Sequence, residues 1–226
     1  MFTQEIRKAE EGYARSKIPW ESLDGYLALL EYHAARNPTR PSYRFHGTDG
    51  ALIEWSFVKT LEMAARFGAV LLAAGAKPGD RVGVWLDTSP QFLMAYFGTM
   101  YAGCIPVCVA GNVQKTAAVL ADCQASFAVV EPALFSVESE LRKLAPSLKK
   151  IFVVDLDEKT APIKRHYGRR EDIAIIQYTS GSTSRPQVSS RNVRIPGCTA
   201  RAASGLCCRR ISSMRNAPIT RSLRSR

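Results

Sequence analysis

Short apolar runs alternate with longer amphipathic stretches along most of this chain. The runs are six or seven residues long and rich in Val, Ile and Phe, a pattern that predicts buried strands. They occupy residues 81–86, 104–110, 126–131, 150–155 and 172–177. Runs that are apolar throughout are typical of parallel strands, which helices cover on both faces.

The amphipathic stretches between these runs predict helices. One begins after Ser56, whose side chain can cap it, and Gly75 can end it. Its predicted apolar face consists of Phe57, Leu61, Ala64, Ala65, Gly68, Leu71 and Leu72. Further helices are predicted at residues 90–103, 114–124 and 133–144. Strands separated by helices pair in parallel through right-handed crossovers, so we predict a three-layer α/β fold, a mostly parallel sheet with flanking helices.

Two segments fall outside this alternation. Residues 42–45 and 51–55 flank Asp49-Gly50, a dipeptide that suits a tight turn, and this arrangement predicts a hairpin. Residues 155–170 are charged and rich in turn formers, which predicts a surface connection.

Residues 88–114 carry no charge and must be compared with a membrane-spanning segment. Ser89-Pro90 is typical of a helix start, and Gly103 followed by Pro106 ends the helix well short of a bilayer span. We therefore predict a buried helix leading into a buried strand, and no membrane span.

The net charge of +11 lies almost entirely in the C-terminal part of the chain. Residues 185–226 contain ten Arg, no Lys and no acidic residue, whereas residues 1–184 hold 21 basic and 20 acidic residues. A basic protein often binds nucleic acid or an anionic surface, but here the body of the chain is nearly neutral.

The six cysteines form no C-x-x-C pair and have no histidine at a zinc-binding spacing, so no metal site is predicted. The first residues mix both charge signs and lack the apolar core of a secretory signal. A cytoplasmic location with reduced thiols is therefore expected, with Cys104, Cys108 and Cys123 acting as buried small apolar residues.

A hydroxyl-rich segment follows the last predicted strand, DIAIIQ. It consists of Thr179, Ser180, Gly181, Ser182, Thr183 and Ser184, and Pro186 lies just beyond it. Glycine allows a polyphosphate to approach the backbone, and hydroxyl and amide groups can donate hydrogen bonds to it. The segment matches neither a Walker loop nor G-x-S-x-G. By composition alone it could equally be a flexible linker, but its place after a buried strand favours phosphate binding.

QYTSGSTSRP resembles the glycine-rich signature of the adenylate-forming (AMP-binding) superfamily, whose loop binds the phosphates of ATP. The upstream segments LLAAGAKPGDRVGVWL and SPQFLMAYFGTMYAGCIPV are similar to family segments as well. Gln177 before the loop and Ser184 within it resemble the fatty-acyl-AMP ligase branch. The resemblance covers the chain from about Trp20 to Pro186.

This resemblance implies ATP-dependent activation of a fatty acid to an acyl-adenylate, with Mg²⁺, followed by transfer to an acyl carrier protein. It assigns the six residues Thr179–Ser184 to the ATP phosphates and no catalytic residue to this chain. An acyl-CoA synthetase or another adenylation-domain fragment is the alternative within the superfamily.

The similarity ends shortly after Pro186, where Gln187 and Val188 replace the family's lysine and glycine. We therefore expect an N-terminal extension at residues 1–19, a partial AMP-binding (adenylation) domain at residues 20–187 and a disordered Arg-rich tail at residues 188–226. A frameshift or truncation after Pro186 is our hypothesis for this change, and it implies that the chain is inactive alone. Translating the downstream nucleotides in the other two frames tests it.

A function of another class is a non-catalytic basic binding protein, in which the ten arginines of the tail contact phosphates. The arginines are scattered and have no aromatic residues interleaved, so no nucleic-acid partner is predicted.

Overall fold

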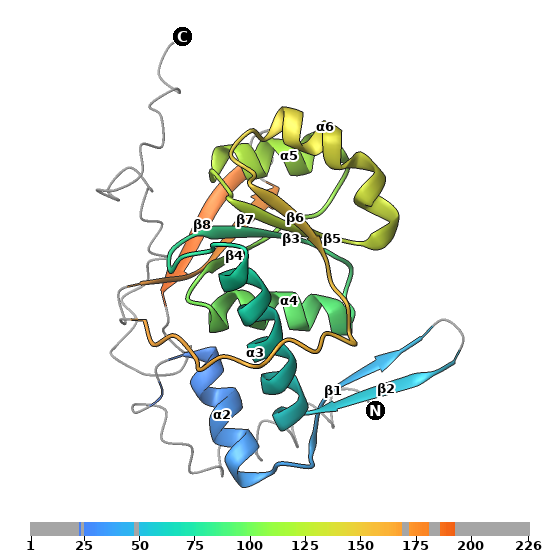
Figure 1. The fold of residues 1–226 in the computed structure, drawn as a ribbon, viewed down its shortest axis with the longest axis vertical. Coiled ribbons are helices and arrows are strands. Elements are labelled where there is room, and N and C mark those ends of the chain that lie inside the picture. Colours follow the sequence, from blue (N-terminus) through green and yellow to red (C-terminus); the bar gives the residue numbers. More distant parts are fainter. Residues whose placement is uncertain (1–22, 24, 48–49, 169–171, 181–185, 193–226) are drawn as a thin grey trace.

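The computed structural model describes residues 23, 25–47, 50–168, 172–180 and 186–192, and only the backbone of residues 179–180 and 186–192. Its centre is a six-stranded sheet of order β6-β5-β3-β4-β7-β8 (Figure 1). The strands are β3 (Arg81–Trp85), β4 (Ile105–Cys108), β5 (Phe127–Val130), β6 (Lys150–Val153), β7 (Ile173–Ser180) and β8 (Pro186–Asn192). The first five are parallel, and β8 is antiparallel to β7.

Helices cover both faces of this sheet (Figure 1). On one face lie α3 (Phe57–Ala73) and α4 (Pro90–Tyr101), with α2 (Tyr26–Arg36) beyond them. On the other lie α5 (Val113–Asp122) and α6 (Glu138–Leu144). The predicted three-layer α/β fold is confirmed.

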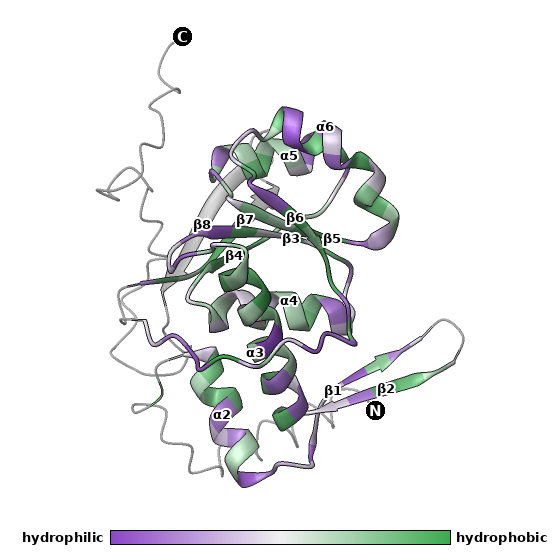
Figure 2. Cartoon of the chain, in the orientation of Figure 1, coloured by the Kyte–Doolittle hydropathy of each residue, from purple (hydrophilic) through white to green (hydrophobic). Residues whose placement is uncertain are grey.

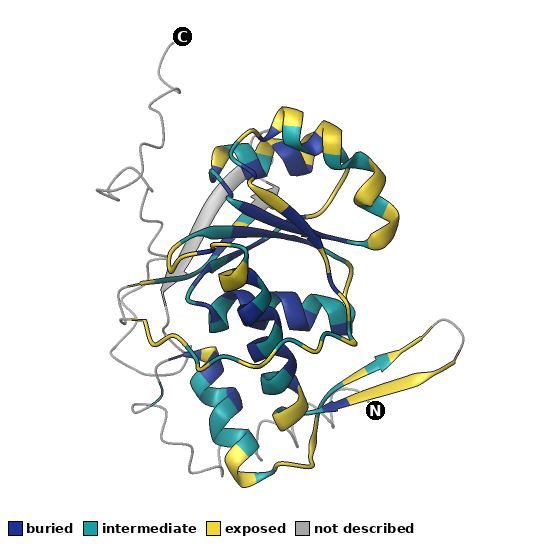
Figure 3. Ribbon diagram, in the orientation of Figure 1, coloured by how far each residue is buried: buried dark blue, intermediate teal, exposed yellow. Residues whose placement is uncertain are grey.

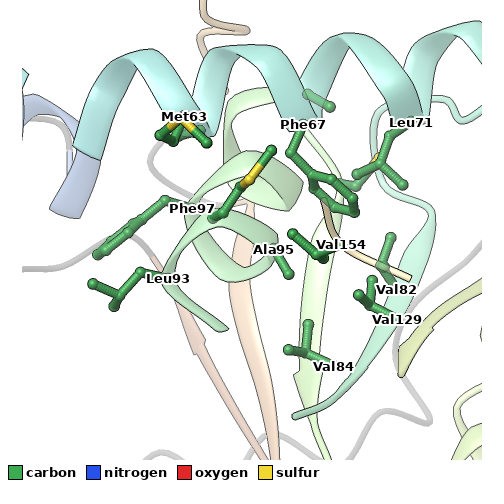
Figure 4. Close-up of a cluster of buried hydrophobic side chains, with 14 of the residues drawn as sticks. Met63, Phe67, Leu71, Val82, Val84, Leu93, Ala95, Phe97, Val129 and Val154 are labelled. Carbon is green, nitrogen blue, oxygen red and sulfur yellow. The ribbon is translucent and has the colours of Figure 1, made fainter. Parts of the chain in front are cut away.

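The central strand β3 buries side chains on both faces, since successive residues of a strand point to opposite sides. Val82 and Val84 pack in the core under α3 and α4, where Figure 4 shows them below Phe67. Trp85 packs in the core under α5. Gly83 faces Leu120 so closely that a Cβ there would lie 2.2 Å from its Cδ2 atom. Figure 3 shows that the buried residues are concentrated in the sheet and in the helix faces against it.

Helices α3 and α4 approach each other closely because glycines lie between them. A Cβ added at Gly98 would lie 2.8 Å from Cβ of Phe67 and 2.9 Å from the carbonyl oxygen of Ala64. A Cβ added at Gly68 would lie 3.2 Å from the carbonyl oxygen of Gly98. The predicted face of α3 is confirmed at Gly68, but the prediction for Leu72 is wrong: its side chain is 39% exposed, on the outer side of the last turn.

The helix ends and the hairpin agree with the predictions. Ser56 Oγ accepts a hydrogen bond from the backbone N of Lys59, and Ser89 Oγ accepts one from Phe92, each at 3.1 Å. Gly75, just after α3, has a φ of 87°. Strands β1 (Pro41–His46) and β2 (Leu52–Ser56) form the hairpin (Figure 2). Asp49 of the predicted turn lies outside the described residues.

Two predictions of secondary structure need correction. Residues 133–144 are not one α-helix, because a 3-10 helix, η2 (Pro132–Val137), precedes α6. None of its side chains is fully buried, and only Leu134 and Val137 pack, half-buried, against the core under α5, so the apolar stripe that could hold it in α-helical form is narrow. Second, strand β8 lies where the regular pattern was expected to end. It pairs with β7 through the backbone, which needs no apolar alternation in the sequence.

Helix α4 accounts for the uncharged stretch and has 12 residues. Within the part of the chain that the structure describes, no helix is both long and apolar enough to cross a membrane.

The three cysteines of the α/β body are free thiols, with Cys104 and Cys123 buried, as predicted, and Cys108 half-buried. Burial raises the pKa of Cys104 to about 12, with a contribution from Asp80. Burial also raises the pKa values of Cys108 and Cys123 to about 11. A thiol that stays protonated is a poor nucleophile, so these cysteines are packing residues.

The close approach of α3 and α4 predicts that Gly98→Ala is destabilising. The new methyl group has no room beside Phe67 and Ala64, and we expect the free energy of unfolding to fall by about 1–3 kcal/mol. Urea denaturation followed by circular dichroism measures it. Gln91→Ala on the same helix is the control, with an expected change within about 0.5 kcal/mol. Wild-type stability of Gly98→Ala would contradict this helix spacing.

The raised thiol pKa values predict slow alkylation of Cys104, Cys108 and Cys123 at pH 8. Their thiolate fraction is at least about a hundredfold below that of a thiol with a pKa of 9.0. Pulsed labelling with N-ethylmaleimide, followed by peptide mass spectrometry, measures each site, and labelling in urea is the control. The folded state also holds these protons above pH 9, where the unfolded state loses them, so stability should fall as the pH rises from 9 towards 11. Fast labelling of the folded chain would contradict the assignment.

Candidate functional site

The carboxyl ends of the five parallel strands meet at one edge of the sheet. After β3 the chain continues into α4 on one face, whereas after β5 it continues into η2 and α6 on the other (Figure 1). The connections therefore diverge between the neighbouring strands β3 and β5. Open α/β sheets bind ligands in the crevice at such a switch point.

A side chain links the ends of β3 and β5 at this point. The carboxylate of Glu131, which follows β5, accepts a hydrogen bond from the backbone N of Asp87 at 3.0 Å. Glu131 is half-buried and Asp87 is exposed. The bond ties the loop after β3 to the loop after β5. Among the described residues, no three His, Cys, Asp or Glu side chains are grouped so that they could hold a metal ion.

The neighbouring strand β4 ends in a sharp turn into α5. Gly111 has a φ of 118°, a conformation that residues other than glycine rarely adopt. Asn112 then caps α5, with Oδ1 accepting a hydrogen bond from the backbone N of Lys115 at 3.0 Å. This turn lies beside the end of β7, because Cys108 of β4 is aligned with Gln177 of β7.

The predicted phosphate-binding segment begins within β7. Thr179 and Ser180 are the last residues of this strand, and they pair with Gln187 and Pro186 of β8. Residues 181–185 follow Ser180 and precede Pro186 in the sequence. Gly181, Ser182, Thr183 and Ser184 lie outside the described residues, as do the side chains of Thr179 and Ser180. The fold thus brings the base of the predicted segment to the edge where a ligand is expected.

The residue before this segment, Tyr178, anchors the end of β7. Its hydroxyl donates a hydrogen bond to Oδ2 of Asp122, at the end of α5, at 2.6 Å. Its ring packs against the core under α5. Burial raises the pKa of the Tyr178 phenol, and the bond to Asp122 raises it further, so the phenol remains a donor. Sequence analysis missed this contact, because Tyr178 and Asp122 are 56 residues apart.

The described histidines lie on α2, on the hairpin and on the chain between β6 and β7. His33 of α2 stacks on Phe57, with ring centroids 4.9 Å apart. Burial, followed by the nearby charge of Arg40, lowers the pKa of His33. His46 is an exposed residue of the hairpin. The ring of His166 lies against Gly103, which precedes β4 and so lies near the opposite edge of the sheet.

A profile of the family described as AMP-binding enzyme matches residues 30–192. This range includes every strand of the sheet, the hairpin and the predicted phosphate-binding segment.

Curated relatives with similar sequences include ligases of two kinds. The crotonobetaine/carnitine–CoA ligase of Proteus sp. (strain LE138) is 28% identical over 176 residues, 68% of this chain and 34% of that protein. The medium-chain-fatty-acid–[acyl-carrier-protein] ligase JamA of Moorena producens is 26% identical over 177 residues, 71% of this chain and 29% of that protein. The chain thus spans about a third of the length of these relatives.

Solved structures with the same fold include ligases as well. The fatty acyl-adenylate ligase of L. pneumophila, in complex with acyl adenylate and pyrophosphate, has a TM-score of 0.62 and 23% identity, over 78% of this chain and 32% of that one. The anthranilate CoA ligase AuaEII has a TM-score of 0.63 and 22% identity, over 79% of this chain and 36% of that one. At these identities the likeness concerns the fold, whereas the match of the family profile to residues 30–192 identifies this chain as a member of the AMP-binding enzyme family.

Proposed function

We propose that this chain is the N-terminal part of a fatty-acyl-AMP ligase and that residues 179–184 bind the phosphates of ATP. The observation that carries the proposal is where β7 ends. Thr179 and Ser180 close this strand at the carboxyl edge of a parallel sheet, beside the capped turn into α5. The family assignment supports the same role.

The reaction that follows from this proposal has two steps. A carboxylate oxygen of the fatty acid attacks the α-phosphorus of ATP and displaces pyrophosphate, which gives the acyl-adenylate. A carrier-protein thiol, losing its proton, then attacks the acyl carbon and displaces AMP. Mg²⁺ bound together with ATP would neutralise part of the charge of its phosphates. Backbone N–H groups and hydroxyls of the segment would hold the phosphates in place, which is the main contribution proteins make to such transfers.

Transfer to a carrier protein is our choice over transfer to coenzyme A. Gln177 and Ser184 resemble the fatty-acyl-AMP ligase branch. Among the similar proteins, JamA is named as a ligase of an acyl carrier protein, and the L. pneumophila protein is named as a fatty acyl-adenylate ligase. The crotonobetaine/carnitine–CoA ligase supports the alternative.

We also propose that these 226 residues do not complete the reaction by themselves. The resemblance implies further parts, namely an adenine-binding segment, acidic residues for ribose and magnesium, and a catalytic lysine in a C-terminal domain. Their motifs are not among the 226 residues, and the chain spans about a third of the length of its ligase relatives.

Binding of ATP tests the role of the hydroxyl segment. Isothermal titration with ATP and Mg²⁺ should give heat of binding with the wild-type chain. The double variant Ser182→Ala/Thr183→Ala should bind at least about tenfold more weakly, because it loses two donors to charged oxygens. Ser136→Ala, an exposed serine of η2, is the control and should bind like the wild type. Equal affinity of the double variant would refute the phosphate contact.

Pyrophosphate exchange tests the proposed inactivity. We expect no fatty-acid-dependent exchange of labelled pyrophosphate into ATP with the 226-residue chain, even where ATP binds. The assay needs no acyl acceptor, so it isolates adenylate formation. Robust exchange would overturn the proposed inactivity and would support the ligase reaction itself.

A further inference from the structure

The connection from β6 to β7 passes from one side of the sheet to the other, and its described part contains no helix. It leaves β6 at one edge and reaches β7 beyond β5, β3 and β4, and in Figure 1 it runs in orange across α3. Its described part, residues 154–168, is here called the strap. Irregular connections of this length are uncommon within a compact domain and often have a function. The sequence predicted a surface connection here.

The middle of the strap is tied to α3. A guanidinium nitrogen of Arg66 donates a hydrogen bond to the carbonyl oxygen of Thr160 at 3.1 Å. Glu62 holds the same guanidinium at 2.9 Å. Further along, the side chain of Ile163 lies over Gly68, where an added Cβ would be 3.0 Å from its Cδ1 atom.

The end of the strap is tied to α2 and α4. Arg165 donates a hydrogen bond to the carboxylate of Glu31 on α2 at 2.6 Å. The Arg165 side chain is only 6% exposed, and that of Glu31 is 33% exposed. The guanidinium also lies 4.6 Å from the centroid of the Tyr167 ring. The backbone N of His166 donates to the carbonyl oxygen of Tyr101, at the end of α4, at 2.9 Å.

The ladder between β7 and the parallel part of the sheet is short. Only two pairs, Val107 with Ile176 and Cys108 with Gln177, align β4 with β7. By contrast, β3 and β4 share four such pairs. Ile173 pairs with β8 alone among the described strands, and its side chain packs against the core under α5. The contacts of the strap therefore add to a small set of contacts that place the start of β7.

We propose that Arg165 and Glu31 are a positioning pair for the phosphate-binding segment. Their ion pair fixes the end of the strap against α2, eight residues before β7 begins, and thereby helps to set where β7 ends at the carboxyl edge, at Thr179 and Ser180. Neither side chain touches the nucleotide. The predicted effect on ATP binding rests on the proposed function. The predicted effect on the stability of β7 rests on the contacts alone.

Single substitutions of the pair should be destabilising, because removing one member of a nearly buried ion pair is costly, whereas an exposed ion pair contributes little. Arg165→Gln and Glu31→Gln each remove one charge. Arg165→Glu/Glu31→Arg restores an ion pair with the charges exchanged, and Arg165→Lys keeps the charge. Lys164→Gln, at the exposed neighbouring position, is the matched control.

Hydrogen exchange and ATP titration of these variants test the proposal. In Arg165→Gln and Glu31→Gln, amides of residues 173–178 should exchange about tenfold faster, while those in the core of α3 and α4 should not change. The dissociation constant for ATP and Mg²⁺ should rise about tenfold in the same variants. The charge-exchanged double variant and Arg165→Lys should recover much of the exchange protection in β7 and much of the affinity for ATP. Lys164→Gln should match the wild type in both measurements.

Each outcome decides one of the two proposals. A uniform increase of exchange throughout the domain, or no recovery in the charge-exchanged variant, would show a general structural role and overturn the positioning pair. Local exchange changes in β7 with unchanged ATP affinity would overturn its link to nucleotide binding. Absence of ATP binding by the wild-type chain would refute the proposed function, and the exchange pattern of β7 would still decide the positioning of the strand.

Discussion

Burial of both faces of β3 is the constraint on which the rest of this structure depends. Val82 and Val84 point towards α3 and α4, and Trp85 points towards α5, so neither helical layer can be removed without exposing the centre of the sheet. Gly83 strengthens the constraint, because the Leu120 side chain of α5 occupies the space where a Cβ would be. The same closeness recurs between α3 and α4 at Gly68 and Gly98.

Parallel pairing around β3 creates the candidate site as a consequence. It brings the ends of β3, β4, β5 and β7 to one edge, so the polar residues that follow these strands gather there. The bond from the Asp87 backbone to Glu131 and the cap of α5 by Asn112 fix two of the loops. Tyr178, through Asp122, fixes the end of the strand from which the proposed phosphate segment emerges. Several elements thus hold the end of the strand from which the proposed segment continues.

Strand β7 differs from the other parallel strands in how it is held. Its ladder with β4 is short, and the described residues between β6 and β7 form no helix, so side-chain contacts take the place of a crossover helix. Arg165 with Glu31, and Arg66 with the strap carbonyls, provide these ties on the α3 and α4 side of the sheet. Tyr178 provides one on the α5 side. Both layers of helices therefore contribute to the placement of one strand.

The sequence by itself determined the local elements and the family. The caps at Ser56 and Ser89, the turn at Gly75 and the apolar runs of the strands depend on residues close together in the chain, and they were predicted where the structure has them. The hydroxyl segment after DIAIIQ pointed to the AMP-binding enzymes, to which the chain belongs. The tertiary structure decided the strand order, the pairing of β8 with β7, the exposure of Leu72 and the contact of Arg165 with Glu31, 134 residues away. Such pairings depend on how the layers pack in space, and no periodicity along a single sequence encodes them.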